Sequence, residues 1–363
     1  GGSIYIHTGL IEKARSTDEL ASVVGHEMSH VKARHIARMS GPDPVNLLGL
    51  LGLFLGGAGT GGQAAAMLGP ALAATKQLAY SRTLEQEADT LGVKHMAEAG
   101  FDPHAALSFF QIINQEKILN PVDAPAYLLT HPLTRERIGS VEAIIGSLRL
   151  KRPGLRGPDP IRKIQILLRL RKNESDALIA NHEKFISRQQ GTAESWHVLG
   201  MAYHDKGKLS LAREKYERAR NMDSNRPGIH RDLGRLYTQI GEYRLAHESF
   251  QRSLKKDVSE SLTYLYLGDL YDHESKFRDA AQAYYRATSL SPLWAEPARR
   301  LGAAYKKMNR LGNAYYYLGR SHLLFDEDGK AIDAMEKALE IFGSISTRGQ
   351  MIRDELDEIK QTQ

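Results

Sequence analysis

Residues 193–226 read AESWHVLGMAYHDKGKLSLAREKYERARNMDSNR, and the pattern of this stretch returns at a fixed step of 34 residues. The Leu-Gly pair at 199–200 recurs at 233–234, 267–268 and 301–302. Three other positions keep the same step: Tyr203, Tyr237, Tyr271 and Tyr305; Ala212, Ala246, Ala280 and Ala314; Tyr216, Phe250 and Tyr284. Glycine and alanine let paired helices approach closely, while the aromatic rings fill the gaps between successive pairs. The stretch therefore predicts a stack of helix pairs.

This period, with small and aromatic residues at these positions, is that of the tetratricopeptide repeat. A degenerate helix pair over 161–189 precedes the regular copies. At the far end the pattern restarts half a repeat early, at Leu318, Gly319, Ala331 and Ala338, as though one helix serves two pairs. We expect an α-solenoid over 161–343 and a C-terminal tail over 344–363. Its concave surface would bind protein partners or unfolded substrates.

The composition is that of a globular protein with room for two domains. The chain has 363 residues, of which 42% are hydrophobic and 25% charged, and a single core rarely serves more than about 250–300 residues. The absence of cysteine excludes a disulfide framework and a thiolate metal site. Because Gly1 rather than Met opens the sequence, we expect a fragment or a processed product, with any signal peptide upstream.

A basic run precedes the repeats. Residues 149–172 carry nine Lys or Arg and one acid, Asp159, within a formal net charge of +6 for the chain. Such a run can bind anionic lipid or nucleic acid. Because prolines and glycines interrupt residues 153–160, we favour a solvated linker over 149–160, and we expect no nucleic-acid partner.

A second unusual stretch lies between Asp43 and Lys76, where 32 residues carry no charge. Glycines cut it into the segments 45–55 and 64–75, each too short to cross a hydrocarbon layer of about 30 Å as a helix. We expect two short helices over 45–75 that pack on the domain preceding the repeats or lie peripherally on a membrane surface. A re-entrant or spanning segment is the alternative.

The sequence His26-Glu27-Met28-Ser29-His30 carries the chemistry. Ser16 and Glu19 resemble a capping box, and the apolar residues after them predict a helix over about 17–39. Positions i and i+4 lie about 40° apart around a helix, so both imidazoles can share one metal ion. Glu27 then reaches the adjacent metal-bound water as a general base. The pattern indicates one Zn²⁺ per chain; two surface histidines are the alternative.

A catalytic zinc needs a third protein ligand and an open position. A second helix, expected over about 83–99, offers Glu85, Glu87 and Asp89. One carboxylate could bind zinc while another hydrogen-bonds a ligating imidazole. Spacing alone leaves Glu85 and Glu87 in competition.

Three blocks of sequence, in order, resemble the HtpX family of zinc peptidases. The first block is Ile4-Tyr5-Ile6, Thr8-Gly9-Leu10, Glu19-Leu20-Ala21, His26-Glu27-x-x-His30 and His35; the second is Glu85-x-x-Ala88-Asp89; the third is Thr130-His131-Pro132 with Arg137-Ile138. The resemblance covers about residues 1–147. Repeats after such a domain are the layout of the BepA-like periplasmic branch of that family.

The resemblance implies a zincin-like α+β metallopeptidase domain over 1–148, mainly helical, with a small sheet whose edge strand lies near residues 4–7. Such an edge can pair with an extended peptide substrate. The resemblance also implies that Glu85 is the third zinc ligand and Asp89 its hydrogen-bonding support. His131 would lie on a loop that can take the fourth zinc position and hold the enzyme inactive. For Arg137 two roles stay open, anchoring that loop or assisting an oxyanion.

By the same resemblance the protein would be periplasmic, peripheral to the outer membrane, and would degrade misfolded or stalled β-barrel precursors. Its repeats would recruit substrates or the outer-membrane assembly machinery. Two alternatives stay open. The protein could act mainly as a tetratricopeptide chaperone or adaptor with latent proteolysis, or it could be an integral membrane peptidase.

Overall fold

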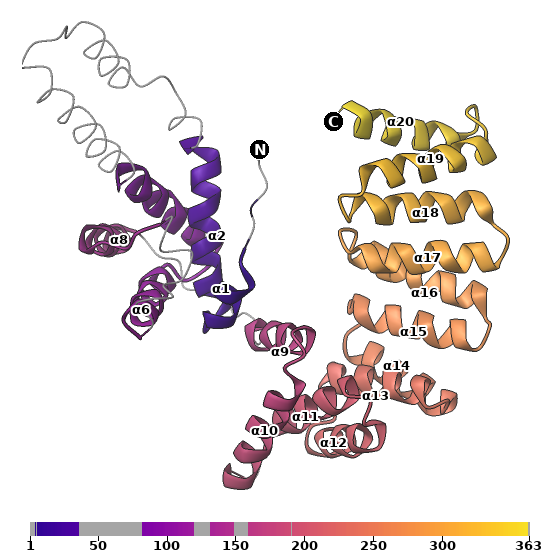
Figure 1. Ribbon diagram of the computed structural model, residues 1–363, viewed down its shortest axis with the longest axis horizontal. Coiled ribbons are helices and arrows are strands. Elements are labelled where there is room, and N and C mark those ends of the chain that lie inside the picture. Colours follow the sequence, from indigo (N-terminus) through magenta and orange to yellow (C-terminus); the bar gives the residue numbers. More distant parts are fainter. Residues whose placement is uncertain are drawn as a thin grey trace, which may run out of the picture. The chain divides into compact units, whose positions relative to one another are not determined.

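The computed structural model describes residues 4, 6–35, 82–119, 131–148, 159–189 and 191–361 (Figure 1). The mainly α fold predicted from the sequence is confirmed, and the chain divides into two compact units, Gly1–Leu168 and Arg169–Gln363. The two helices expected over 45–75 and most of the linker expected over 149–160 lie outside the described residues. Among the described residues, no helix combines the length and the apolar character needed to cross a membrane.

The described part of the first unit contains α1 (Thr8–Lys13), α2 (Thr17–Lys32), a helix over 82–98, α6 (His104–Leu119), α8 (Arg135–Ser147) and the larger part of α9 (Ile161–Arg171). Residue 35 is also helical, after a turn at residues 33–34. At the start of α2 the Ser16 hydroxyl accepts a hydrogen bond from the Glu19 backbone N–H at 3.1 Å, as the capping pattern predicts. The Glu19 carboxylate accepts instead from the Arg15 N–H. Two backbone N–H groups at the start of α2, those of Glu19 and Arg15, are therefore satisfied by side chains.

α2 ends at Lys32, earlier than the end expected near residue 39. Arg34 adopts a left-handed backbone with φ 52°, which an α-helix cannot continue through. The chain therefore turns after Lys32, and His35 folds back toward the helix that it follows.

The core of the first unit lies around α6. Phe109 packs with Val23 of α2, whereas Phe110 belongs to a cluster with Val93 of the 82–98 helix and Val141 of α8. Two neighbouring aromatic residues of one helix thus hold the other helices on its two sides. Burial of large apolar side chains of this kind contributes about 1.5–3 kcal/mol each.

The edge strand expected near residues 4–7 is wrong for the described residues of that stretch. Ile4, Ile6 and His7 have no regular secondary structure, and α1 begins at Thr8. A strand requires a hydrogen-bonded neighbour, and none of the described segments forms one.

The beginning of α9 packs on the corner between α1 and α2. The Asp159 carboxylate accepts a hydrogen bond from the Thr17 backbone N–H at 2.8 Å, and the Gln165 amide donates to the Ala14 carbonyl at 2.7 Å. These contacts place the boundary between the units within α9, after Leu168, rather than before the helix as expected.

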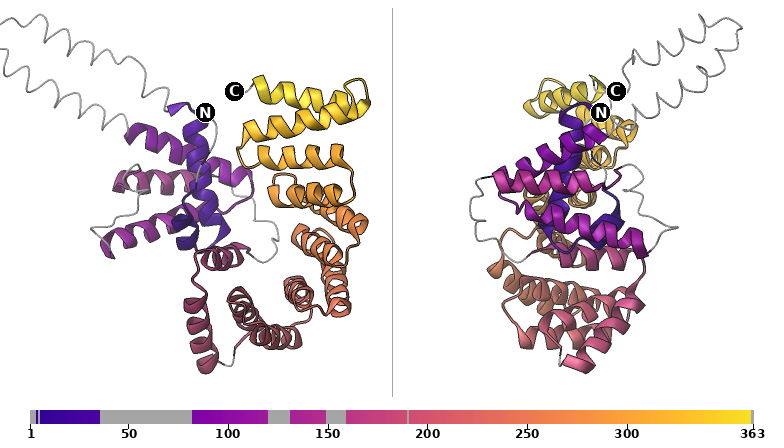
Figure 2. Two further views of the ribbon diagram at one scale, coloured as in Figure 1. Left: turned by 45° about the vertical axis from the view of Figure 1, so that its right-hand side comes forward. Right: turned by 90° about the vertical axis from the view of Figure 1, so that its left-hand side faces the viewer.

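The second unit is a row of antiparallel helices that stack in chain order (Figures 1 and 2). They are α10 (Ser175–Gln189), α11 (Ala193–Asp205), α12 (Leu209–Met222), α13 (Pro227–Gln239), α14 (Tyr243–Lys256), α15 (Ser261–His273), α16 (Phe277–Leu290), α17 (Ala295–Lys307), α18 (Leu311–Leu323), α19 (Asp328–Phe342) and α20 (Thr347–Gln361). The predicted repeat array is confirmed.

The repeated glycines sit where the sequence indicates close helix approach. A Cβ at Gly234 would lie 2.6 Å from the Phe250 ring, and one at Gly268 would lie 2.5 Å from the Tyr284 ring. Each aromatic side chain therefore occupies the space that a larger residue would need. α18 packs against both α17 and α19, which confirms that one helix serves two pairs.

The segment expected as a C-terminal tail contains α20. Ile352, Leu356 and Ile359 are buried in the same cluster as Met335 of α19. Their spacing of four and three residues forms one apolar face, so α20 covers the end of the array.

Candidate metal centre

Two imidazoles of α2 form one side of the candidate site. His26 is 4% exposed, and its Nε2 atom lies 3.0 Å from Nε2 of His30. One helical turn separates the two residues, so both rings point to the same side, as the spacing predicts. Glu27 lies beside them with a side chain that is 25% exposed. A half-buried carboxylate at the edge of the site can reach both a solvent molecule and a bound substrate.

The 82–98 helix supplies the third donor. Its Glu85 carboxylate has Oε2 3.4 Å from His26 Nε2 and Oε1 3.3 Å from His30 Nε2. Glu87, the competing candidate by spacing, is 38% exposed on its side chain and faces His35 instead. Positions 85 and 87 lie about 200° apart around a helix, so only one of them can face α2.

His131 brings a fourth donor atom to the same place. Its Nδ1 atom lies 3.2 Å from His26 Nε2 and 3.0 Å from Glu85 Oε1. The other ring nitrogen, Nε2, lies 3.5 Å from Glu27 Oε1. The His131 ring thus stands between the third donor and the expected general base.

The spacing of these atoms fits a tetrahedral zinc ion. Four donors at about 2.0–2.1 Å from zinc would lie about 3.3 Å from one another. The donor atoms of His26, His30, Glu85 and His131 all lie within 4.8 Å of one another, and their closest separations are 3.0–3.4 Å. Nitrogen and carboxylate donors are also those that zinc accepts in cysteine-free sites. The residues therefore fit the metal that the sequence pattern indicates.

Asp89 supports the first of the two imidazoles. Its Oδ1 atom accepts a hydrogen bond from Nδ1 of His26 at 2.9 Å, so a neutral His26 ring would present an unprotonated Nε2 to a metal. Arg137 donates to the same carboxylate through Nε at 2.7 Å and Nη2 at 2.8 Å. Burial alone would raise the pKa of Asp89, but hydrogen bonds from Arg137 and His26 lower it below its ordinary value. Asp89 is therefore held ionised.

Arg137 also contacts the His131 segment. Its Nη1 atom donates to the Pro132 carbonyl at 3.0 Å and lies 3.0 Å from Glu85 Oε2. The guanidinium is 2% exposed and stacks over the Phe110 ring at 5.4 Å. The buried Arg137 guanidinium thus contacts the donor Glu85, the Asp89 carboxylate that hydrogen-bonds His26, and the Pro132 carbonyl next to His131.

The charges of the site favour ionised carboxylates. Burial alone would raise the pKa of Glu85, but hydrogen bonds from His131, His26 and His30 hold it well below its ordinary value. Burial lowers the pKa of His26, yet its hydrogen bonds to Asp89 and Glu85 outweigh this effect and raise the pKa to about 9. A cation is therefore favoured among these donors, whether it is a proton or a metal ion.

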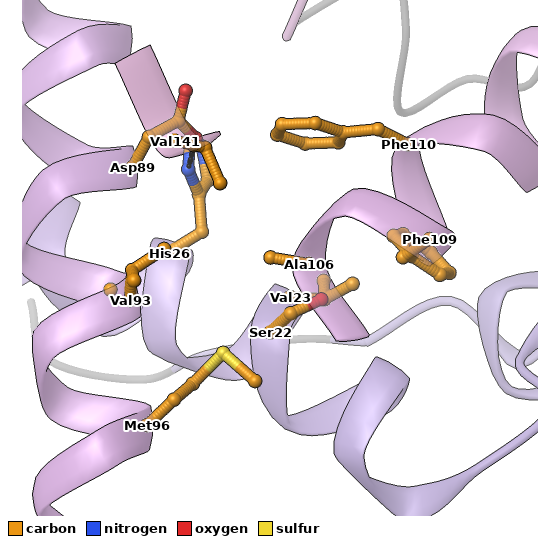
Figure 3. A pocket seen from close by; sticks show the side chains of 11 residues that line it. Ser22, Val23, His26, Asp89, Val93, Met96, Ala106, Phe109, Phe110 and Val141 are labelled. Atoms are coloured by element: carbon orange, nitrogen blue, oxygen red, sulfur yellow. Dashed lines mark hydrogen bonds and ion pairs between the residues drawn. The ribbon is translucent and has the colours of Figure 1, made fainter. Parts of the chain in front are cut away.

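A cavity of about 20 Å³ borders His26 and Asp89 (Figure 3). His26 and Asp89 line it, whereas the other three donors do not, and most of the remaining lining is apolar, including Phe109, Phe110 and Val141. A volume of this size holds about one water molecule. The cavity is therefore too small for a peptide substrate.

A glycine contact sets the distance between the two donor helices. A Cβ at Gly25 would lie 3.1 Å from the Gly92 carbonyl oxygen, and one at Gly92 would lie 3.0 Å from the His26 backbone nitrogen. The helices approach this closely only because neither residue has a side chain. Sequence reasoning missed this pair, although glycines inside two predicted helices are a visible signal.

His35 is a second residue whose contact sequence reasoning did not foresee. The residue is 1% exposed, and its Nδ1 atom lies 2.8 Å from Nδ1 of His30. A helix continued to residue 39 would point His35 away from the metal ligands. The early end of α2 at Lys32 brings it back.

Comparisons with known proteins agree with the two units. The family model described as peptidase family M48 matches residues 1–145, and two tetratricopeptide repeat models match residues 193–226 and 231–293. The first part of the chain thus matches a peptidase family M48 domain, and the part after it matches tetratricopeptide repeats. The family indicated by the three blocks of sequence is thereby confirmed, and the donor set described above lies wholly within the M48 match.

Curated relatives resemble the M48 part. A putative beta-barrel assembly-enhancing protease of Vibrio cholerae is 36% identical over 144 residues, covering 38% of this chain and 30% of the relative. The beta-barrel assembly-enhancing protease of Escherichia coli is 32% identical over 156 residues, covering 41% of this chain and 32% of the relative. The mitochondrial metalloendopeptidase OMA1 of Bos taurus is 30% identical over 171 residues, covering 44% of this chain and 33% of the relative. The chain thus spans about a third of the length of these relatives.

Among solved structures, MamA matches 45% of this chain and 95% of its own, with 22% identity and a TM-score of 0.39.

Proposed function

We propose that the protein is a zinc-dependent endopeptidase whose site is held latent by His131. The observation that carries the proposal is the convergence of His26, His30 and Glu85 on one point, with Glu27 at its edge. These are three donors and a base, which is the set that zinc-dependent peptide hydrolysis requires. The matches to M48 peptidases support the reaction class.

In this proposal each side chain has a separate task. Zinc, when bound, supplies a Lewis acid that lowers the pKa of a coordinated water to about 7. Glu27 accepts a proton as the water oxygen adds to the peptide carbonyl carbon, and then gives it to the leaving nitrogen as the C–N bond breaks. Asp89 keeps the His26 ring in the tautomer that presents Nε2 to the metal.

His131 blocks both parts of this machinery. A fourth protein ligand closes a tetrahedral site and leaves no place for water. In the same position the Nε2 atom of His131 faces Glu27 at 3.5 Å, so the base is also covered. Because Arg137 is buried and donates to the Pro132 carbonyl, we assign it to anchoring this segment rather than to an oxyanion.

The names of the M48 relatives bear on the substrate. The relatives from Vibrio cholerae and Escherichia coli are called beta-barrel assembly-enhancing proteases, so we propose misfolded or stalled outer-membrane β-barrel precursors as substrates. The protein would then act in the periplasm, peripheral to the outer membrane. The repeats would recruit substrates or the assembly machinery through their helix surfaces.

The proposal is tested by zinc content and casein cleavage, measured for the wild type, Glu27→Gln and His131→Ala. We expect one zinc per chain in all three, cleavage that rises in His131→Ala, and none in Glu27→Gln. A wild-type protein without zinc would overturn the proposal. Zinc without cleavage in any of the three proteins would favour the second candidate.

That second candidate is a chaperone or adaptor that works through its repeats, with the peptidase permanently latent. The position of His131 within the donor set favours it. In cells that lack the protein, Glu27→Gln separates the two functions. The variant restores an adaptor-dependent phenotype and fails to restore a protease-dependent one.

A further inference from the structure

The two zinc-binding histidines of α2 have different supports. The Nδ1 atom of His26 meets the carboxylate of Asp89 at 2.9 Å. The Nδ1 atom of His30 meets another imidazole, that of His35, at 2.8 Å. The two rings stand nearly perpendicular, at 84°, with centroids 4.8 Å apart. Nothing in the H-E-x-x-H pattern requires this second arrangement.

The positions of the hydrogens follow from the metal site. His30 presents Nε2 to the other donors, so this atom must be unprotonated when it binds a metal, and the ring hydrogen then sits on Nδ1. That hydrogen points to Nδ1 of His35, which must accept it. A neutral His35 consequently carries its own hydrogen on Nε2, which lies 3.4 Å from Glu87 Oε2.

The surroundings of His35 fix this arrangement in place. The side chain is 1% exposed. It is held by the turn after Lys32, where Arg34 has a φ of 52°. Glu87 lies on the same helix as Glu85, so the 82–98 helix supports both the metal and the residue behind His30.

We infer that His35 is a positioning residue that orients His30 and fixes its tautomer for zinc binding. The inference rests on the proposed zinc site and deepens it. His35 touches neither substrate nor metal, and it acts through the hydrogen bond to Nδ1 of His30. A residue of this kind changes metal affinity by about 10–100-fold when it is replaced.

Three variants of His35 separate positioning from packing. In His35→Asn the side-chain oxygen can take the place of Nδ1 and accept the same hydrogen. In His35→Gln the amide lies one bond further out, where Nε2 stands, and the acceptor near His30 is lost. His35→Leu fills the space without any acceptor. His95→Leu is the matched control, because His95 lies near Ser29 and Lys32, neither of which is a metal donor.

The measurement is zinc affinity by competition with a chelator, on the full chain, with circular dichroism to verify that each variant is folded. We expect His35→Gln and His35→Leu to bind zinc about 10–100-fold more weakly than the wild type, and His35→Asn and His95→Leu to bind close to it. If His35→Leu fails to fold, the comparison of the two amides decides the question.

Equal affinities in the Asn and Gln variants would overturn the inference, and so would weak binding in His95→Leu to the same degree. Both results would leave the proposed peptidase intact. Absence of zinc from the wild type would instead overturn the proposed function itself. The two failures are therefore distinguishable.

Discussion

Arg137 is the residue on which the metal donors and the His131 segment both depend. Its guanidinium donates to Asp89 and to the Pro132 carbonyl and lies 3.0 Å from Glu85. Removal of one partner from a buried ion pair costs about 3–5 kcal/mol, because the remaining charge stays buried. Removal of the Arg137 guanidinium would leave the carboxylates of Asp89 and Glu85 buried without this cation.

We therefore predict that Arg137→Met lowers the free energy of unfolding of the first unit by about 3–5 kcal/mol and weakens zinc binding by about 10–100-fold. Arg135→Met is the control, since Arg135 is an exposed cation at the start of the same helix. Thermal unfolding and chelator competition measure the two effects. Equal behaviour of the two variants would contradict the prediction.

His26 links zinc binding to pH. After a chelator has removed any metal, the Asp89 and Glu85 contacts outweigh burial and raise the pKa of His26 from 6.5 to about 9. The proton on His26 then stabilises the fold fully below pH 6.5, and this contribution is lost as the pH rises through about 9. Zinc needs the neutral ring, so it displaces that proton.

We predict that zinc binding to the chelator-treated protein releases a proton at pH 7 and that its affinity rises with pH up to about 9. Calorimetric titrations in buffers of different ionisation enthalpy measure the proton release. Glu27→Gln, which keeps all four donors, should behave like the wild type. An affinity that does not depend on pH between 7 and 9 would contradict the prediction.

At the residue scale, the sequence predicts the geometry of residues within one helix, but it does not predict contacts between helices. The spacing of His26 and His30 fixes their geometry without any knowledge of the rest of the fold. Spacing cannot choose between Glu85 and Glu87, because the choice depends on the side of the 82–98 helix that faces α2. The contact of His35 with His30 was hidden for the same reason, since it depends on the end of α2.

At the scale of elements, the crossing of α2 and the 82–98 helix determines the geometry of the candidate metal site. The two backbones meet at Gly25 and Gly92, and this contact places the donors of one helix 3.3–3.4 Å from those of the other. A methyl group at Gly92 would meet backbone atoms, which cannot rotate away as a flexible side chain can. The helices would have to separate.

We predict that Gly92→Ala weakens zinc binding and lowers the unfolding temperature. Gly139→Ala is the matched control, because a Cβ there meets no atom within 4 Å. An alanine in an open helical position stabilises by about 0.5–1 kcal/mol, so the control should gain stability while Gly92→Ala loses it. Zinc affinity and thermal unfolding of both variants check this. A gain in stability for both would sink the idea.

Elements were predictable where their signals are local. The Ser16 hydroxyl, for example, caps the start of α2 where the sequence predicts the helix to begin. The strand expected near residues 4–7 depended on a partner strand, which no local signal can guarantee. The end of α2 depended on one backbone angle, at Arg34.

At the scale of the whole molecule, the chain combines two units whose architectures are unequally predictable from their sequences. The repeat array is periodic, and three successive copies repeat the same contact, since Gly200, Gly234 and Gly268 meet equivalent rings. The periodicity therefore predicted the architecture. The unit boundary inside α9 and the capping role of α20 lie outside the repeat, and only their packing shows them.

The array also contains a buried charge network that is independent of the metal donors. Arg231 and Asp232 of α13 are 2% and 5% exposed and pair through two hydrogen bonds of 2.7 and 2.8 Å. His197 of the preceding repeat adds a hydrogen bond of 2.8 Å to the Asp232 carboxylate. Burial would raise the pKa of Asp232, but Arg231 and His197 hold it well below its ordinary value.

We predict that Asp232→Asn lowers the free energy of unfolding of the repeats by about 3–5 kcal/mol at pH 7, since it leaves Arg231 buried without its main partner. Both tryptophans, Trp196 and Trp294, lie in the repeats, so their fluorescence during heating reports on this unit alone. Asp333→Asn, at an exposed position of α19, is the control. Zinc affinity should be unchanged in both variants, because all four donors lie in the first unit.

The pH dependence of this difference has a definite sign. A carboxyl group whose pKa is lowered by folding stabilises the protein above the pKa of the unfolded chain, which is about 3.9 for aspartate. The wild-type advantage over Asp232→Asn should therefore persist from pH 7 down to about pH 4 and shrink only in stronger acid, as the pH falls toward the folded pKa. An advantage already lost at pH 5.5 would show that Asp232 is not held ionised by Arg231, and that the repeats do not depend on this pair.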